Sequence, residues 1–358
     1  MTGVPGVPSG ATVWRILYHS RTIYGVDIAE SGYAITPAAS APVNGFPIIA
    51  WAHGTTGFGR LCAPSLFTRQ AGVGVYLLPG LATYLRAGFA VAATDYEGLG
   101  APGIHGYLLG ESEGRAVLDA ARAARQLPGH RLSDTVIIYG HSQGGHAALF
   151  AGELAPSYAP DLQVVGVVAA APATGLRTIM AVGLIPAGQD ILGYSLATAY
   201  SWTQVYRDLP VSDVFTPAGA KVAGPTVTTG CQSAEGVAIA AHRLTAASVY
   251  QPGAATNPVV VAHAKLNDPG RVKTKAPILV VQGTADTTVP PPLTDTYVTS
   301  MACEIGDTID YLHVPGATHG TVVFDAVPTI LQWMQARLRG ARAPTTCGKP
   351  GDVTVISP

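Results

Sequence analysis

The segment VIIYGHSQGGHAALF at residues 136–150 constrains the fold more than any other part of the chain. Val136–Tyr139 is apolar throughout, as in a short buried strand, and Gly145–Phe150 continues in residues typical of a helix start. Between them lies a G-x-S-x-G motif centred on Ser142, the sequence form of a sharp strand-to-helix turn that holds a nucleophilic serine at the end of a sheet. Its glycines allow strained backbone and close approach of strand and helix. The alternative is a glycine-rich turn with an ordinary exposed serine, because the chain contains 42 glycines.

Composition limits the classes of function. A chain of 358 residues can form one large domain, or a core with an insertion. The net charge of −1 offers no basic surface for nucleic acid or for an anionic membrane. No apolar run reaches the roughly 18 residues of a membrane span. We therefore expect a soluble protein without a transmembrane segment or a nucleic-acid partner.

The cysteines indicate an exported protein. Cys62, Cys231, Cys303 and Cys347 form an even set without C-x-x-C spacing, which disfavours metal ligation and favours two disulfides. Four reduced core cysteines are the alternative. Residues 1–10 lack the basic start and apolar core of a signal peptide, so we expect the processed form of a secreted protein with an added start methionine.

Apolar runs of strand length alternate with helix-like segments. This rhythm predicts an α/β fold with a mostly parallel central sheet and helices on both faces. Val13–Thr22 and Val26–Thr36 are strand-like too, and we expect them to pair antiparallel at a sheet edge. The other predicted strands are Pro47–Ala52, Phe89–Thr94, Val136–Tyr139, Val164–Ala171, Pro277–Gln282 and Thr308–Val314, and the predicted core helices are Leu77–Ala87, Ser112–Gln126, Pro291–Met301 and Val322–Leu338.

The alternation breaks after Pro172. Residues 174–266 read mainly as short helices with Gly and Pro interruptions, which predicts a helical cap, or lid, inserted over the carboxyl ends of the strands. A separate helical domain unrelated to catalysis is the alternative. The core then consists of residues 1–173 and 267–358, the latter including a C-terminal tail from residue 343.

A nucleophilic serine needs a base, and the base needs a carboxylate that orients it. In this architecture the acid and the histidine follow the serine along the chain, each in a loop after a later strand. Asp286 is the only carboxylate in the loop after Pro277–Gln282, so we predict it to be the acid. Its alternative role is a turn or helix cap. Asp310 and Asp295 are weaker candidates, because they lie inside a predicted strand and helix.

His319 is the predicted base. It lies in the glycine-containing loop after Thr308–Val314 and directly before a helix, whereas His313 belongs to the strand itself. A lone histidine is usually structural, but Ser142, Asp286 and His319 follow one another in the required order.

The oxyanion formed on attack needs hydrogen-bond donors already directed at it. The backbone N–H of Gln143, the residue after the nucleophile, is the first predicted donor. The second is expected from Thr55 or Thr56, in the Gly- and Thr-rich turn after Pro47–Ala52. A plain turn is the alternative.

Several motifs together resemble the secretory lipases of the fungal lipase A type and their actinobacterial relatives, within the α/β-hydrolases. The similarity extends from residue 13 to about residue 340. The motifs are His53–Gly57, Cys62–Ser65, Thr94–Gly100, Tyr139–Gly145, Gly283–Asp286 and Gly316–His319.

The resemblance implies an α/β-hydrolase core, a helical lid after the sixth strand and a Ser142–Asp286–His319 triad. It also implies carboxylic-ester hydrolysis, often with acyl transfer to alcohols, without metal or cofactor. The disulfide pairing that it implies is Cys62–Cys231 and Cys303–Cys347.

Fungal members carry an oxyanion-hole aspartate near the position of Thr56, and its absence leaves the second donor open between Thr55 and Thr56. We predict a serine carboxylic-ester hydrolase, a lipase or esterase acting on hydrophobic or lipid-like esters through an acyl-enzyme. An acyltransferase or peptidase of the same fold, or a catalytically silent binding protein, is the alternative. We expect a monomer that contacts lipid interfaces only transiently.

Overall fold

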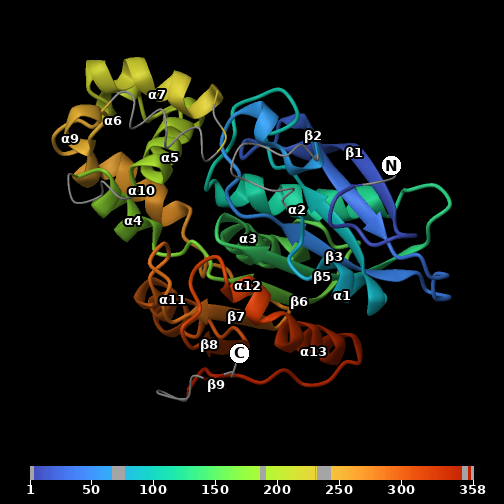
Figure 1. The fold of residues 1–358 in the computed structure, drawn as a ribbon. Helices are drawn as coiled ribbons and strands as arrows, with labels where there is room; N and C mark the ends of the chain where they lie inside the picture. The colour runs from blue at the N-terminus through green and yellow to red at the C-terminus, as the bar shows by residue number, and fades with distance from the viewer. Residues whose placement is uncertain are drawn as a thin grey trace.

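The computed structural model describes residues 4–66, 77–185, 191–229, 231, 243–348 and 354–355. In this part of the chain the strands form one nine-stranded sheet in the order β1-β2-β4-β3-β5-β6-β7-β8-β9 (Figure 1). Only the β1–β2 and β2–β4 pairs are antiparallel, and every other pair is parallel. The predicted α/β fold with a mostly parallel sheet is confirmed.

The strands follow the apolar runs of the sequence closely. β1 and β2 pair over their full length, which confirms the antiparallel edge pair. β9 is a short strand in the predicted tail, paired with β8. The strands are β1 (Thr12–Arg21), β2 (Asp27–Thr36), β3 (Phe46–Ala52), β4 (Ala90–Thr94), β5 (Leu132–His141), β6 (Gln163–Ala170), β7 (Ile278–Gly283), β8 (Ile309–Val314) and β9 (Thr354–Val355).

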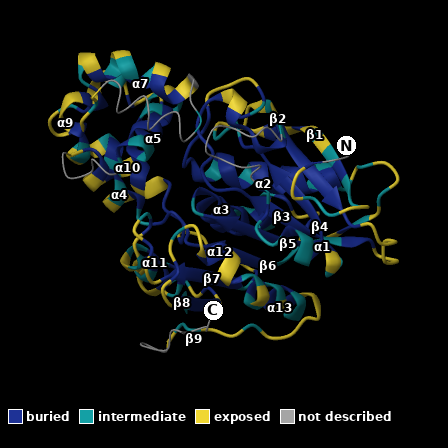
Figure 2. Ribbon diagram, in the orientation of Figure 1, coloured by how far each residue is buried: buried dark blue, intermediate teal, exposed yellow. Residues whose placement is uncertain are grey.

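Side chains alternate between the two faces of the sheet, and each face has its own apolar core. The strands at the centre of the sheet are buried (Figure 2). Ile48 and Ile138 pack in the cluster with α2 (Gly110–Ala124) and α3 (Gln143–Tyr158). Their neighbours Ile49 and Ile137 pack in the opposite cluster with residues of α1 (Leu81–Arg86) and α13 (Val327–Leu338). Burial on both faces explains why these strands are apolar throughout.

Three predicted helices differ in extent from those in the structure. The segment predicted as Pro291–Met301 is α-helical only as far as Tyr297 and continues as a π-helix over Val298–Ala302. The segment predicted as Leu77–Ala87 becomes helical only at Leu81, after the Pro79-Gly80 turn. The segment predicted as Val322–Leu338 is divided at Ala326 into α12 (Val322–Asp325) and α13. Pro328 occupies the first turn of α13, where its missing N–H removes no helical hydrogen bond.

Between β6 and β7 the chain leaves the sheet and forms a group of helices beside the core (Figure 1). These helices have their own apolar cluster, in which Trp202 is fully buried. The cluster also includes Tyr107, Leu108 and Leu109, so the inserted helices pack on the loop before α2. Among the residues described, the α-helices of this region are α4 (Leu176–Gly183), α5 (Leu192–Val205), α6 (Val211–Val214), α7 (Pro217–Thr229), α9 (Ala246–Val249) and α10 (Pro258–Leu266).

Two disulfides connect distant parts of the chain. Cys62 is joined to Cys231 and Cys303 to Cys347, the pairing that the resemblance implies. The first ties the segment after β3 to the inserted region, and the second ties the C-terminal tail to the segment after α11 (Pro291–Tyr297). Of the helices described, none has the length and apolar character needed to cross a membrane.

Candidate active site

Ser142 lies at the turn between the central strand β5 and helix α3, with φ 58° and ψ −119°. A non-glycine residue rarely adopts a positive φ, so the backbone is strained here. The flanking glycines make the turn possible. A Cβ on Gly140 would lie 1.8 Å from the carbonyl oxygen of Gly144, and a Cβ on Gly144 would lie 1.9 Å from that of Ala52. The G-x-S-x-G motif therefore meets a steric requirement of this turn.

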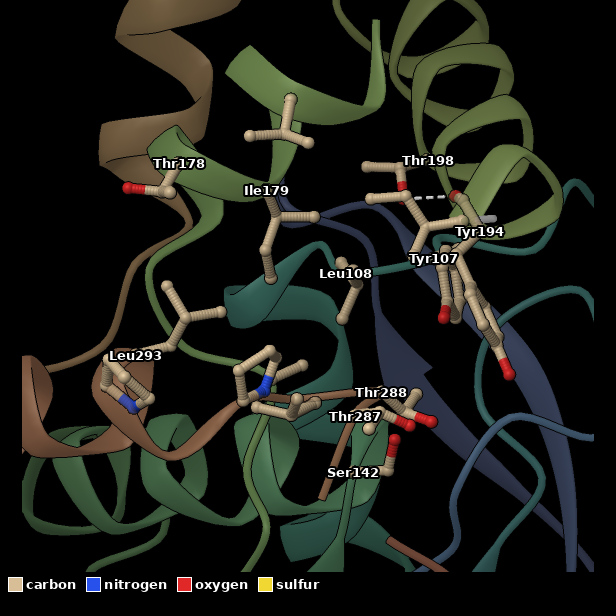
Figure 3. A pocket seen from close by; sticks show the side chains of 16 residues that line it. Tyr107, Leu108, Ser142, Thr178, Ile179, Tyr194, Thr198, Thr287, Thr288 and Leu293 are labelled. Carbon is tan, nitrogen blue, oxygen red and sulfur yellow. Dashed lines mark hydrogen bonds between the residues drawn. The ribbon is translucent and has the colours of Figure 1, made fainter. Parts of the chain in front are cut away.

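The Ser142 side chain points into a cavity of about 430 Å³ at the carboxyl end of the sheet (Figure 3). One wall comes from the loop before α2, with Tyr107 and Leu108, and another from the Thr287–Pro290 segment after β7. The wall provided by the inserted helices consists of Thr178, Ile179, Val182, Ile191, Tyr194 and Thr198. The lining is mostly apolar, with hydroxyl groups interspersed.

Asp286 lies in the loop after β7, and its side chain is fully buried. Oδ1 accepts hydrogen bonds from the backbone N–H groups of Thr288 and Val289, each at 2.9 Å. Oδ2 accepts from Gln282 Nε2 at 3.1 Å and lies 2.7 Å from His319 Nδ1. Burial raises the pKa of this carboxyl, but the hydrogen bond from His319 and the two backbone donors hold it below its ordinary value.

His319 lies in the loop after β8, as predicted, and its side chain is 18% exposed. Its carbonyl oxygen accepts a hydrogen bond from His141 Nε2 at 2.9 Å, and the two imidazole rings lie 4.7 Å apart. Since His141 precedes Ser142, these contacts place His319, the predicted base, next to the nucleophile turn. In this conformation the Ser142 hydroxyl makes no hydrogen bond to His319. Such contacts are often long before substrate binds.

His141 is a site residue that our sequence analysis did not identify. It is buried, and burial lowers its pKa to about 3, so the ring is neutral at ordinary pH. In the sequence, only its position between the glycine and serine of the G-x-S-x-G motif indicates that His141 lies near the site. That position does not predict a hydrogen bond to a residue 178 positions away.

The predicted oxyanion donors lie on two elements beside Ser142. Gln143 is the first residue of α3, so its backbone N–H has no intrahelical partner and lies at the positive end of the helix dipole. The Thr55 hydroxyl is 2.8 Å from the Tyr107 hydroxyl. The Thr56 hydroxyl is buried and has no hydrogen-bond partner among the residues described.

The weaker candidates lie in other clusters. Asp295 accepts a hydrogen bond from the Tyr311 hydroxyl at 2.6 Å, and His313 Nε2 is 2.8 Å from the same hydroxyl. Asp310 is buried in β8, where Arg337 is the charged group that acts on it. Within the described ranges, no group of three or more His, Cys, Asp or Glu residues is arranged to hold a metal ion.

The secretory lipase family matches residues 66–201 of the chain. A probable inactive lipase of Mycobacterium tuberculosis is 30% identical over 177 residues, covering 46% of this chain and 38% of that protein. Lipase A of Arthroderma benhamiae is 25% identical over 364 residues, covering 94% of this chain and 73% of that protein. The chain thus spans less than two thirds of the first of these relatives and more than two thirds of the second.

The solved structure of Candida antarctica lipase A superposes on this fold with a TM-score of 0.77 at 19% identity. The superposition covers 97% of this chain and 81% of that one. At 19% identity this similarity establishes a shared fold and nothing about function.

Proposed function

We propose that the chain, which has an α/β-hydrolase fold and is similar in sequence to the secretory lipases, is a serine carboxylic-ester hydrolase. The observation that carries the proposal is the Asp286–His319 pair, held at 2.7 Å beside the turn that presents Ser142 to the cavity. A carboxylate that accepts from Nδ1 fixes the imidazole tautomer whose Nε2 can take a proton.

The reaction would proceed in two stages. Ser142 Oγ attacks the ester carbonyl while His319 Nε2 takes its proton, and Asp286 stabilises the resulting imidazolium. The tetrahedral oxyanion receives hydrogen bonds from the N–H of Gln143 and from Thr55 or Thr56. The alcohol leaves with the proton from His319. Water, activated by the same imidazole, then releases the acid from the acyl-enzyme.

The apolar cavity favours hydrophobic or lipid-like esters. Since residues 174–266 supply one wall of it, we propose that they form a lid whose position controls access. The core would then comprise residues 1–173 and 267–358. The protein is extracellular, as indicated by its secretory lipase relatives and its two disulfides, which persist in oxidising compartments.

The proposal is tested with p-nitrophenyl esters and a fluorophosphonate probe. Ser142→Ala is expected to lower kcat by about 10⁴–10⁶-fold and to abolish labelling, with unchanged circular dichroism. Ser157→Ala, which changes an exposed serine of α3, serves as the matched control and should leave both unchanged. Retention of more than a few per cent of activity in Ser142→Ala would refute the assignment.

One observation favours a second candidate, a catalytically silent protein. A relative that matches 46% of this chain is described as a probable inactive lipase. The same labelling experiment separates the two functions, because a silent protein would neither react with the fluorophosphonate at Ser142 nor hydrolyse any ester from C2 to C16.

A further inference from the structure

Glu113 is a carboxylate buried in α2, directly behind the nucleophile turn, and only 1% of it is exposed. Its Oε1 accepts hydrogen bonds from Gln143 Nε2 at 2.8 Å and from the backbone N–H of Leu108 at 3.0 Å. Its Oε2 lies 2.8 Å from His146 Nδ1. A buried charge without partners would be strongly unfavourable, and these three donors compensate it.

The Gln143 side chain is held from a second side by His105. Gln143 Nε2 lies 3.1 Å from His105 Nε2, and His105 Nδ1 lies 2.9 Å from the carbonyl oxygen of Glu97. Since that carbonyl can only accept, His105 carries its proton on Nδ1, which leaves Nε2 to accept from the amide of Gln143. Both hydrogens of the amide are therefore used. Gln143 is also the residue whose backbone N–H is the first proposed oxyanion donor.

His146, one turn further along α3, completes the arrangement. Its Nε2 lies 2.8 Å from the carbonyl oxygen of Asn267, so this nitrogen carries a proton. Its Nδ1 lies beside Glu113 Oε2, so both ring nitrogens have a partner and the buried carboxylate is paired. Burial lowers the pKa of His146, but the hydrogen bond and charge of Glu113 raise it above its ordinary value.

The same network reaches the wall of the cavity and the end of the inserted region. Leu108 lines the cavity and has a positive φ of 53°, which the hydrogen bond to Glu113 helps to hold. Asn267 follows α10, and its side-chain oxygen accepts from the N–H of Gly110 at 2.9 Å. One carboxylate therefore connects the nucleophile turn, the cavity wall and the return of the inserted helices.

We propose that Glu113 is a positioning residue for the oxyanion hole, which it holds in place through the side chain of Gln143. The inference rests on the ester-hydrolase function proposed above. Glu113 itself does not reach the cavity, so it acts on the transition state only by fixing the Ser142–Gln143 peptide. A purely structural ion pair would instead contribute to folding alone.

The test compares Glu113→Ala with Glu113→Gln in the full-length protein. Glu113→Ala is expected to lower kcat by about 10–10²-fold, below the 10²–10³-fold effect of losing an oxyanion donor outright. KM should stay within about threefold of the wild-type value, because the contacts that bind the ester before the reaction are not changed. A glutamine can accept from Leu108 and Gln143 and donate to a neutral His146, so Glu113→Gln should restore most of the lost kcat.

A trifluoromethyl ketone provides the readout that a structural role would not change. It forms a tetrahedral adduct with the serine and places an oxyanion in the hole, so its affinity should fall by the same factor as kcat in Glu113→Ala. Glu153→Ala is the matched control. It removes a buried carboxylate of α3 that contacts Gly270 rather than Gln143, and kcat and ketone affinity should both stay at the wild-type level.

Gln143→Ala covers the case in which Glu113→Ala fails to fold. This variant keeps the backbone N–H of residue 143 and the Glu113–His146 pair, but it removes the amide that Glu113 and His105 hold. We expect the same loss of kcat as in Glu113→Ala. Unchanged ketone affinity in Glu113→Ala and Gln143→Ala, or a loss confined to KM, would overturn the proposal. If the wild-type protein hydrolyses no ester and is not labelled by fluorophosphonate, the proposed function has failed instead.

Discussion

Asp286 Oδ2 lies 2.7 Å from His319 Nδ1, although 33 residues separate the two in sequence. An asparagine at position 286 would present either an amide N–H or a neutral oxygen to this nitrogen, and would no longer enforce the productive tautomer. We expect Asp286→Asn to lower kcat by about 10⁴-fold with little change in KM. Steady-state kinetics on a p-nitrophenyl ester measures this, with the exposed Asp325→Asn as control. A loss of less than tenfold would contradict the role of Asp286 as the acid.

His141 holds the loop of His319, the proposed base, through its hydrogen bond to the His319 carbonyl oxygen. His141→Phe keeps an aromatic ring beside His319 and removes only the N–H donor. We expect kcat to fall by about 10²-fold, the effect of a displacement near 1 Å in a catalytic group. Because the pKa of His141 is about 3, its loss should not move the acid limb of the kcat profile between pH 5 and 8. A shift of that limb by a full pH unit would show that His141 itself titrates during the reaction.

The sequence predicted the sheet, and the loops in which the three proposed triad residues lie, because both are encoded locally. Apolar runs mark strands that are buried on both faces, and Ser142, Asp286 and His319 each follow such a run. Parallel strands bring their carboxyl ends to one edge, so position along the chain was sufficient to expect that these residues meet.

The supporting residues carry no such local signal. Glu113 lies in a helix whose charged residues would be expected on the solvated face, yet it is buried against Gln143 and His146. His105 lies in an irregular loop, 38 residues before the side chain that it contacts. Whether such groups are buried and paired depends on tertiary packing, which neither periodicity nor spacing contains.

Thr55 and Thr56 can be distinguished by their different hydrogen bonding. The Thr56 hydroxyl is buried without a partner among the described residues, whereas the Thr55 hydroxyl is paired with Tyr107. A buried hydroxyl without a partner destabilises the free enzyme by about 1–3 kcal/mol, so Thr56→Val should raise the free energy of unfolding. If that hydroxyl serves the oxyanion, kcat should fall by about 10²-fold in the same variant.

Thr55→Val is the companion measurement for this prediction. It removes the hydrogen bond to Tyr107 and should lower the free energy of unfolding by about 1 kcal/mol, with a smaller loss of kcat than in Thr56→Val. Urea unfolding and ester kinetics on both variants test the pair. The reverse order of the two kcat values would assign the donor to Thr55.

The disulfides are expected to stabilise the fold to different degrees. Cys62–Cys231 closes a segment of 169 residues and Cys303–Cys347 one of 44 residues. Each should contribute about 2–4 kcal/mol, the longer loop more, because cross-linking restricts the unfolded chain. The double variants Cys62→Ser/Cys231→Ser and Cys303→Ser/Cys347→Ser are compared by urea unfolding. Equal midpoints for wild type and the first variant would show that the bond to the inserted region adds nothing to stability.

Glu153 gives the protein a pH-dependent stability that one substitution should remove. Its carboxyl is 8% exposed and accepts the N–H of Gly270 at 2.5 Å, and burial raises its pKa to about 7. An unfolded glutamate titrates near about 4.3. Between about pH 4.3 and pH 7 the carboxyl of Glu153 is protonated in the folded protein and ionised in the unfolded chain. The contribution of this proton to the stability of the folded state is therefore complete below about pH 4.3 and is lost as the pH rises through 7.

Glu153→Gln keeps an acceptor for Gly270 but cannot ionise. Its free energy of unfolding should match that of the wild type near pH 4.5 and exceed it by about 2–4 kcal/mol at pH 8. Glu304→Gln changes an exposed carboxyl and should follow the wild-type curve throughout. Urea unfolding from pH 4.5 to 8.5 measures all three proteins. Parallel curves for wild type and Glu153→Gln would mean that Glu153 titrates alike in the folded and unfolded states, since only a difference between the two produces a slope.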